Sequence, residues 1–544
     1  MWKQMYDPMN SIFLSALITT IPIFYFLWAL AIKKIKGHIA GLTTVGLAIL
    51  ISIIAFKMPV KLAMISTSYG ALMGLFPISW IIVSAVFLYK ITVKTGQFDI
   101  IRNSIVTITE DRRLQTLLIA FSFGAFLEGA AGFGTPVAIS AALLTGLGFN
   151  PLYAAGLSLI ANVAPVAYGA IGIPITVAAK TTGIDAMAIS QMIGRQMPFL
   201  SLLTPFWLVF IISGWKGMKE VLPAILVSGG SFAIAQYLTS NFIGPELPDI
   251  TAALLSLLTT ALFLKVWKPK QTFRFEDEKN DLLNKVVSSR ETYTSLQVIK
   301  AWSPFILLTV FVILWGIPVV QSILTKTNIL FNIPGLHEAV IKTTPIVPKE
   351  YAYEATFKFD WLATAGTAIF LAAFISKFIA GMKMSEWLKT LNETVKELIF
   401  PLITIVSVLG LAYIYNYSGM SATLGLALSR TGHLFPFFAP ILGWLGVFLT
   451  GSDTSANALF GNLQKITANQ IGVDPILTVA ANTSGGGTGK MISPQSIAIA
   501  TAATGLVGKE GDLFRFTLKH SVMFVIIVGI MTYIQAYFLT WMIP

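Results

Sequence analysis

The chain has 544 residues, of which 55% are hydrophobic and only 11% are charged, and its mean hydropathy is +0.77. This composition is typical of a chain whose surface mostly faces lipid, and it excludes a soluble protein built from several water-exposed domains. The formal net charge of +12 does not indicate nucleic-acid binding, because the lysines and arginines stand in short clusters at the ends of apolar runs.

Apolar windows of about 20 residues recur along the chain from Ser11 to Pro544, and each is long enough to cross a bilayer. The first, from about Ser11 to Ile32, is followed by lysines instead of a small-residue cleavage site, which predicts a retained span. Basic residues favour the inner side of a membrane. The clusters predicted to lie inside are Lys33 to Lys36, Lys90 to Arg113, Lys216 with Lys219, Lys265 to Lys300, Lys383 to Lys396 and Lys509 to Lys519. The sequence therefore predicts a multi-pass protein of the cell membrane with both termini outside.

The stretch from Pro269 to Arg290 is the most polar part of the chain and is typical of a solvated inner linker. We expect three parts: a first repeat with two extra spans (1–268), a cytoplasmic linker (269–300) and a second repeat (301–544). One long outer segment is expected from about Gln321 to Asp360.

The two halves share short motifs at a nearly constant offset, which indicates an internal repeat. The matching pairs are GLFPI at Gly74 and LIFPL at Leu398, GAFLEG at Gly124 and GVFLTG at Gly446, GFNPL at Gly148 and GVDPI at Gly472, Asn162 and Asn482, and Pro174 and Pro494. The orientation map gives the halves opposite directions, so the repeat is predicted to be inverted, as in many secondary transporters.

Glycine, proline, serine and threonine interrupt the apolar sequence four times, at Leu127–Ser140, Ala161–Thr176, Leu449–Gly461 and Ala481–Ser496. A broken backbone at membrane depth is tolerated only where protein or a water-filled cavity satisfies its polar groups. Helix restarts after such breaks expose N–H donors that favour a carboxylate. An anionic substrate is the simplest inference, although a single glycine-rich patch can also serve close helix packing.

Three charged residues lie at these breaks. Glu128 and Asp453 stand at or beside the two predicted hairpin tips, where a charge must be paired, hydrated or neutralised by a proton. Lys490 is the best fixed cation for a substrate carboxylate, and an ion pair with Glu128 or Asp453 is its rival role. We expect Lys180 to reach the interface and Arg430 to be a vestibule charge.

Enzymatic functions find little support in the sequence. The four histidines have no paired metal-ligand spacing, and Gly489-Lys490 is followed by Met491, which does not fit a phosphate-binding loop. The absence of cysteine excludes disulfides, thiol catalysis and thiolate metal sites. The sequence predicts neither a cofactor nor a metal.

Several long motifs resemble the lactate permease family over essentially the whole chain. They are GAFLEGAAGFGTPVAISAALL, NPLYAAGLSLIANVAPVAYGAIGIPI, FLTGSDTSANALFGNLQ and AANTSGGGTGKMISPQSIAIA. The resemblance implies symport of L-lactate with a proton, with glycolate and D-lactate as further substrates. It also implies kinship with transporters that have hairpins and an elevator-like transport unit, some of which are homodimers.

The predicted fold is an all-α polytopic membrane protein with about twelve spans and two re-entrant hairpins, at roughly Leu114–Gly148 and Pro436–Gly472. The substrate-binding candidates are Thr135, Asn162, Tyr168, Thr450, Ser452, Thr454, Asn482, Ser484, Lys490, Ser493 and Gln495, and the proton-coupling candidates are Glu128 and Asp453. A sodium-coupled organic-anion symporter, suggested by the polar tip around Asp453, and a passive anion channel remain the alternative functions.

Overall fold

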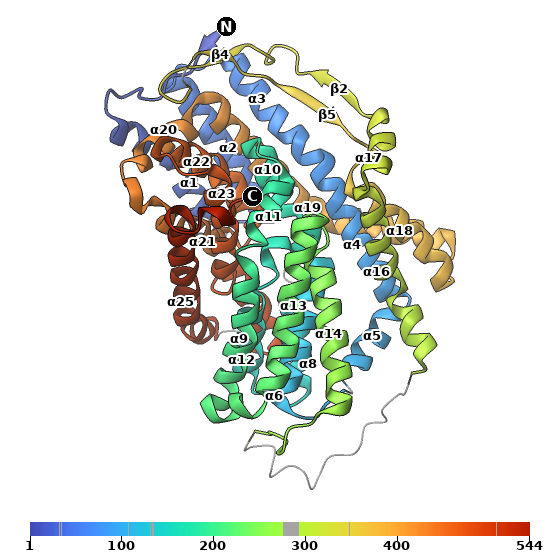
Figure 1. The fold of residues 1–544 in the computed structure, drawn as a ribbon. Helices are drawn as coiled ribbons and strands as arrows, with labels where there is room; N and C mark the ends of the chain where they lie inside the picture. Colours follow the sequence, from blue (N-terminus) through green and yellow to red (C-terminus); the bar gives the residue numbers. More distant parts are fainter. Residues whose placement is uncertain are drawn as a thin grey trace.

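The computed structural model describes residues 1–31, 33, 35–106, 108–130, 132, 135–275, 293–347, 349–506 and 509–544. Helices dominate it (Figure 1), because a helix satisfies its own backbone polar groups in lipid. Within these ranges eight helices are long and apolar enough to cross a membrane, or up to ten if each of two bent helix pairs is one span. The predominantly helical, multi-pass fold is confirmed, and the number of about twelve spans stays a prediction.

One group of helices packs around the long helix α19 (Met384–Ser418). Glycines permit the closest approach, since a Cβ on Gly74 would lie 2.8 Å from the Cα of Val406 in α19. Ion pairs of Lys90 with Glu397 and of Lys94 with Glu393 also join α4 to α19. The other helices of this group are α1 (Ile12–Ala31), α2 (Gly37–Ile54), α3 (Val60–Met73), α4 (Ser79–Lys94), α5 (Gln97–Val106), α16 (Ser295–Gly316), α17 (Pro318–Leu324) and α18 (Ala365–Ala380).

A second group contains both predicted hairpins and packs beside the first (Figure 1). Its members are α6 (Arg112–Gln115), the π-helix η2 (Thr116–Phe123), α7 (Gly124–Ala130), α8 (Thr135–Gly146), α9 (Pro151–Ala161), α10 (Gly169–Thr182), α11 (Ala186–Ile193), α12 (Met197–Glu220), α13 (Leu222–Phe242), α14 (Pro248–Val266), α20 (Met420–Ser429), α21 (Phe435–Thr450), α22 (Asp453–Ile471), α23 (Pro475–Lys490), α24 (Pro494–Thr504) and α25 (Glu510–Tyr537).

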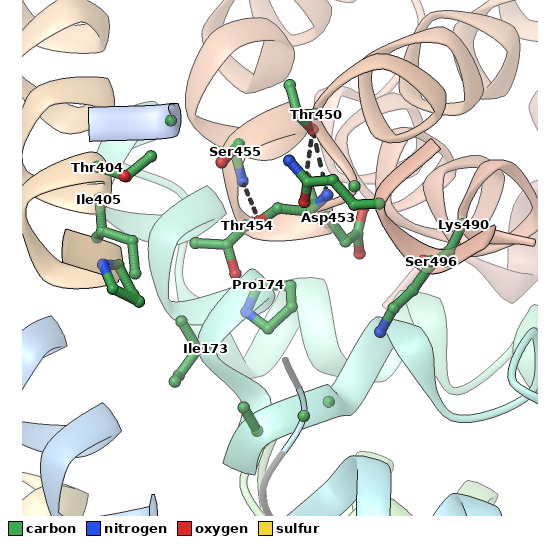
Figure 2. Close-up of a pocket in the computed structure, with 18 of the residues that line it drawn as sticks. Ile173, Pro174, Thr404, Ile405, Thr450, Asp453, Thr454, Ser455, Lys490 and Ser496 are labelled. Carbon is green, nitrogen blue, oxygen red and sulfur yellow. Dashed lines mark hydrogen bonds between the residues drawn. The ribbon is translucent and has the colours of Figure 1, made fainter. Parts of the chain in front are cut away.

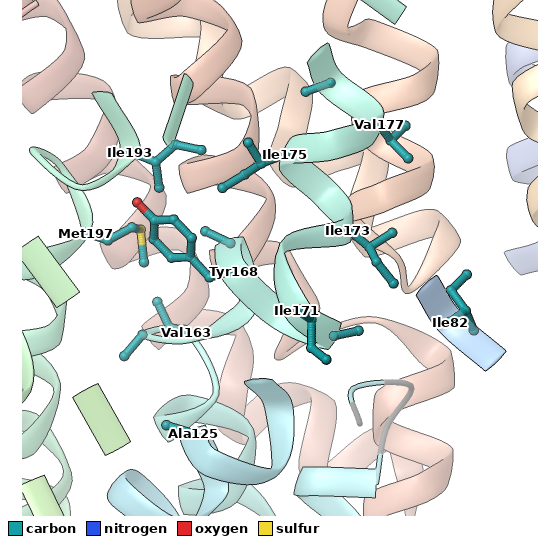
Figure 3. Packing of buried hydrophobic residues seen from close by; sticks show 14 of the residues in the cluster. Ile82, Ala125, Val163, Tyr168, Ile171, Ile173, Ile175, Val177, Ile193 and Met197 are labelled. Atoms are coloured by element: carbon teal, nitrogen blue, oxygen red, sulfur yellow. The ribbon is translucent and has the colours of Figure 1, made fainter. Parts of the chain in front are cut away.

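The chain turns sharply between helices at the places that the sequence marks as breaks. Helix α9 and the segment Val166–Thr182, which contains α10, meet at an angle of 62°, and the backbone at the start of α10 is left-handed at Ala170, Ile171 and Gly172 (φ 46°, 59° and 69°). Left-handed conformations at two residues with side chains are strained and need support from their surroundings. The apolar core gives that support, because Ile171 is buried within it and Tyr168 lies buried close to Val163 and Ile193 (Figure 3).

Short strands cover the end of the molecule where the N-terminus lies (Figure 1). Strand β1 (Trp2–Lys3) pairs in parallel with β3 (Val340–Lys342), which pairs antiparallel with β4 (Tyr351–Ala352). Strands β2 (Ile329–Asn332) and β5 (Thr356–Phe359) form an antiparallel ribbon. The N-terminus and the segment from Gln321 to Asp360 therefore share one face, as the sequence predicts, although the strands themselves were not expected.

A buried arginine organises the opposite end of the second group. The guanidinium group of Arg113 is fully buried, and it binds Asp111 at 2.8 Å and Glu220 at 2.7 Å. It also donates to the carbonyl oxygen of Gln271 at 3.0 Å. Arg113 thus ties the start of the first hairpin to α12 and to the beginning of the polar linker.

Candidate functional site

A cavity of about 590 Å³ lies where a hairpin tip and two helix breaks meet (Figure 2). Its walls come from the ends of α7 and α23, the starts of α2, α10, α22 and α24, and the middle of α19. Its polar and charged lining residues are Lys36, His38, Glu128, Thr404, Thr450, Ser452, Asp453, Thr454, Ser455, Lys490, Gln495 and Ser496. The cavity therefore unites residues from both halves of the chain.

An ion pair crosses between the two halves at the cavity wall. Nζ of Lys490 lies 2.6 Å from Oε1 of Glu128, and the two residues are only 7% and 3% exposed. The amide nitrogen of Asn162 donates to Oε2 of Glu128 at 3.0 Å. Such charge-assisted contacts offset part of the cost of burying both ions.

The carboxyl group of Asp453 lies at the same site without a partner. Neither of its oxygens has a hydrogen bond to any residue that the structure describes, and the residue is 4% exposed. It packs against Gly486 of α23, where a Cβ would collide with Oδ1. A buried carboxylate of this kind is costly, so the group needs a proton or a bound cation to neutralise it.

Two helix N-termini converge on the cavity. Ser452 is the N-cap of α22, and its hydroxyl accepts from the backbone N–H of Ser455 at 3.2 Å. Ser493 caps α24 in the same way through the N–H of Ser496 at 3.2 Å. Because helix N-termini carry partial positive charge and free N–H groups, this arrangement suits an anion.

The structure places the predicted residues in two sets. Those that line the cavity are Glu128, Thr450, Ser452, Asp453, Thr454, Lys490 and Gln495. Those that lie behind it in buried hydrogen bonds are Asn162 to Glu128, Tyr168 to the Ser190 carbonyl, Asn482 to Asn457, Ser484 to Gln196, and Ser493 in its cap. Thr135 begins α8, but its side chain lies outside the described residues. Lys180 and Arg430 do not belong to the lining, and Arg430 stacks over Phe13 at 4.9 Å.

Sequence reasoning missed the part of the lining that α2 and α19 contribute. In the sequence, Lys36 belongs to a basic cluster that serves only to predict the orientation of the chain in the membrane. His38, two residues later, stacks on Phe400 with ring centroids 4.5 Å apart. Thr404 and Ile405 of α19 also line the cavity. Pro401, one helical turn before Ile405, was the only local signal that could have drawn attention to α19.

The glycine run of α23 proves to be helical, so the break expected within Ala481–Ser496 falls after the glycines, at Met491–Ser493. Helix α23 continues to Lys490, and the chain departs from it only before Pro494. A Cβ on Gly485 would collide with the carbonyl oxygen of Pro440, and one on Gly489 with that of Trp444. The glycines therefore let α21 and α23 approach closely, as small residues do in membrane helices.

This packing makes Gly485→Ala destabilising. The methyl group has no free space against the α21 backbone, so we expect a loss of about 1–3 kcal/mol, as for other overpacked sites. The measurement is the midpoint of thermal unfolding in detergent. Gly46→Ala in α2 is the matched control, because nothing lies within 4 Å of its Cβ position, and it should leave the midpoint unchanged or raise it.

Comparisons with known proteins agree over the whole chain. The family model described as L-lactate permease matches residues 15–539. The chain is 56% identical to the L-lactate permease of Bacillus subtilis (strain 168) over 568 residues, with 100% of both chains covered. It is 57% identical to the glycolate permease GlcA of Escherichia coli (strain K12) over 555 residues, with 100% of this chain and 99% of that one covered.

A solved structure supports the fold alone. The Neisseria gonorrhoeae protein MtrF, described as one of a class of antimetabolite efflux pumps, matches with a TM-score of 0.51 at 14% sequence identity. The match covers 94% of this chain and 97% of MtrF. The helix arrangement is therefore one that is known from a transporter.

Proposed function

The chain belongs to the L-lactate permease family, and from this premise we propose that it transports L-lactate, glycolate and D-lactate across the cell membrane in symport with protons. The observation that carries the proposal is the ion pair between Lys490 and Glu128 in the wall of the cavity. One fixed cation next to one titratable carboxylate is the minimum needed to couple an anion to a proton.

Coupling follows from competition for Lys490. A substrate carboxylate that binds the ammonium group displaces Glu128, which is then left as a buried charge unless it takes up a proton. Binding of the anion and protonation of Glu128 therefore favour each other. The site moves as a neutral complex only when both are bound, which prevents leakage of either one alone.

The remaining lining supplies specificity for a 2-hydroxy acid. In this proposal the N-terminus of α22 stabilises the carboxylate, and the hydroxyl groups of Thr450 and Thr454 and the amide of Gln495, which line the cavity, bind the substrate hydroxyl. Isoleucine side chains such as Ile173 and Ile405 leave an apolar wall for the methyl group of lactate.

The proposed architecture is an inverted repeat in which residues 1–268 and 301–544 are the two units and 269–300 is the cytoplasmic linker. Its support is the set of matching motifs in the two halves, together with one cavity that is lined by α7 and α10 from the first half and by α21, α22, α23 and α24 from the second. With Lys33 to Lys36 inside and both termini outside, the cavity extends toward the cytoplasm. The helices around the hairpins form the moving unit of an elevator against α19 and its neighbours, and we include a homodimer in this proposal by analogy.

Uptake of radiolabelled L-lactate into proteoliposomes tests the proposed function. In sodium-free buffer with an inward proton gradient, we expect concentrative uptake that collapses when a protonophore is added. Uptake that appears only when sodium is added would mean that the coupled ion is sodium and not the proton. Equilibration that never exceeds the external concentration would indicate a channel.

A further inference from the structure

A third carboxyl group, that of Asp249, is buried beside the ion pair of Glu128 and Lys490. Asp249 is the second residue of α14 and is only 1% exposed. A Cβ placed on Gly129, which directly follows Glu128, would lie 2.7 Å from the Cβ of Asp249. The start of α14 therefore packs against the end of the first hairpin helix, outside the lining of the cavity.

Asp249 has no hydrogen-bond partner for either carboxyl oxygen among the residues of the described ranges. The elements packed against α14 are α7, α13 and η2, and their ionisable side chains are Glu128 of α7 and Tyr237 of α13, of which Tyr237 is 41% exposed. Lys490 and Tyr168 are its other electrostatic neighbours, and the Tyr168 hydroxyl donates to the carbonyl oxygen of Ser190 at 2.8 Å. A carboxyl group in such surroundings is strongly disfavoured as an ion and is tolerated as the neutral acid.

The balance of charges at the site points the same way. Glu128, Asp249 and Asp453 could carry three negative charges around the buried ammonium group of Lys490, while Lys36 is the other lysine of the cavity lining, and the same site must accept an anion. Glu128 has Lys490 and Asn162 as partners, so its charge is compensated. A proton on Asp249 and another on Asp453 leave the buried pair of Lys490 and Glu128 as the only opposite charges of these four residues, and those two charges balance.

We infer that Asp249 holds a proton and passes it to Glu128 when the substrate carboxylate takes Lys490. The O–H bond of the Asp249 acid breaks and an O–H bond forms on Glu128, so the charge that the substrate displaces moves to Asp249. A proton from water then restores Asp249 to the neutral acid. The net result is one anion and one proton taken up, and this inference rests on the proposed function.

The test compares two modes of transport in Asp249→Asn. Exchange of internal for external lactate at equal pH needs no net proton movement, so it should stay within about twofold of the unmodified protein. Uptake driven by an inward proton gradient needs delivery of a proton to Glu128, and its initial rate should fall roughly tenfold or more, as when a proton-transfer group is removed. Asp185→Asn is the matched control, since Asp185 is an exposed N-cap of α11 and asparagine also caps, and it should leave both modes unchanged.

An infrared measurement on the unmodified protein gives a second readout that does not depend on how a variant folds. We expect a band from a buried carboxylic acid at neutral pH, and a weaker band in Asp249→Asn because Asp453 still contributes. Absence of that band in the unmodified protein, or equal loss of exchange and driven uptake in the variant, would overturn the inference. If the unmodified protein itself shows no proton-driven uptake, the proposed function fails first.

Discussion

Glu128→Gln should abolish proton-driven accumulation of lactate while preserving exchange. A gradient of one pH unit corresponds to about 1.36 kcal/mol per proton, so the unmodified protein should concentrate lactate up to about tenfold. Glutamine resembles the protonated acid and cannot release a proton, so Lys490 stays available to the substrate but transport no longer depends on pH. The measurement is the ratio of internal to external lactate at steady state, and a ratio near one is expected.

The control for this variant is Glu397→Gln, which removes the surface partner of Lys90. The side chain of Glu397 is 67% exposed, and surface ion pairs contribute about 0–1 kcal/mol, so uphill transport should persist. If Glu128→Gln still concentrated lactate under the same gradient, Glu128 would not be the coupling group, and Asp453 would become the next candidate.

Lys490→Met should remove lactate binding and also destabilise the protein. The variant leaves Glu128 without its partner, and losing one member of a buried ion pair costs about 3–5 kcal/mol. The affinity for lactate should fall by about 30-fold or more, since truncating one partner of a buried charge pair typically costs about 2–5 kcal/mol of binding energy. Calorimetric titration with lactate and thermal unfolding measure the two effects separately.

The double variant Glu128→Gln with Lys490→Met separates stability from function. It removes both charges, so the unfolding midpoint should recover toward that of the unmodified protein. Lactate binding should stay as weak as in Lys490→Met alone. Recovery of binding together with stability would mean that Lys490 serves the fold and does not contact the substrate.

The parts of the site that the sequence predicts best are those where polar residues interrupt an apolar run. Glu128, Asp453 and Lys490 were expected at breaks, and the structure brings all three to one cavity. Charged groups inside apolar sequence have few reasons to exist other than function or pairing, so their position alone makes them candidates. Lys490 makes the ion pair with Glu128 that the sequence offers as its rival role, and it also lines the cavity, while its contact with a substrate carboxylate stays a prediction.

Other parts of the site carry no local signal. Asp249 follows a proline at the start of a helix, where an acidic residue is an ordinary favourable feature, so only its neighbours in space make it unusual. Thr404 lies in a long regular helix, and its place in the lining depends on how α19 packs. The glycine run around Gly485 is compatible in sequence with a helix break and with a helix-packing surface. Only the close approach of the α21 backbone, seen in the structure, shows that it is a packing surface.

The ion pair between Lys490 and Glu128 joins residues 362 positions apart in the chain. During biosynthesis the first half of the chain emerges and enters the membrane long before Lys490 has been made. Glu128 must therefore cross the insertion machinery as a neutral acid or wait in a hydrated environment. A chain that ends early would expose an unpaired acidic residue in the membrane, and this defect would let quality-control proteases distinguish incomplete chains from finished ones.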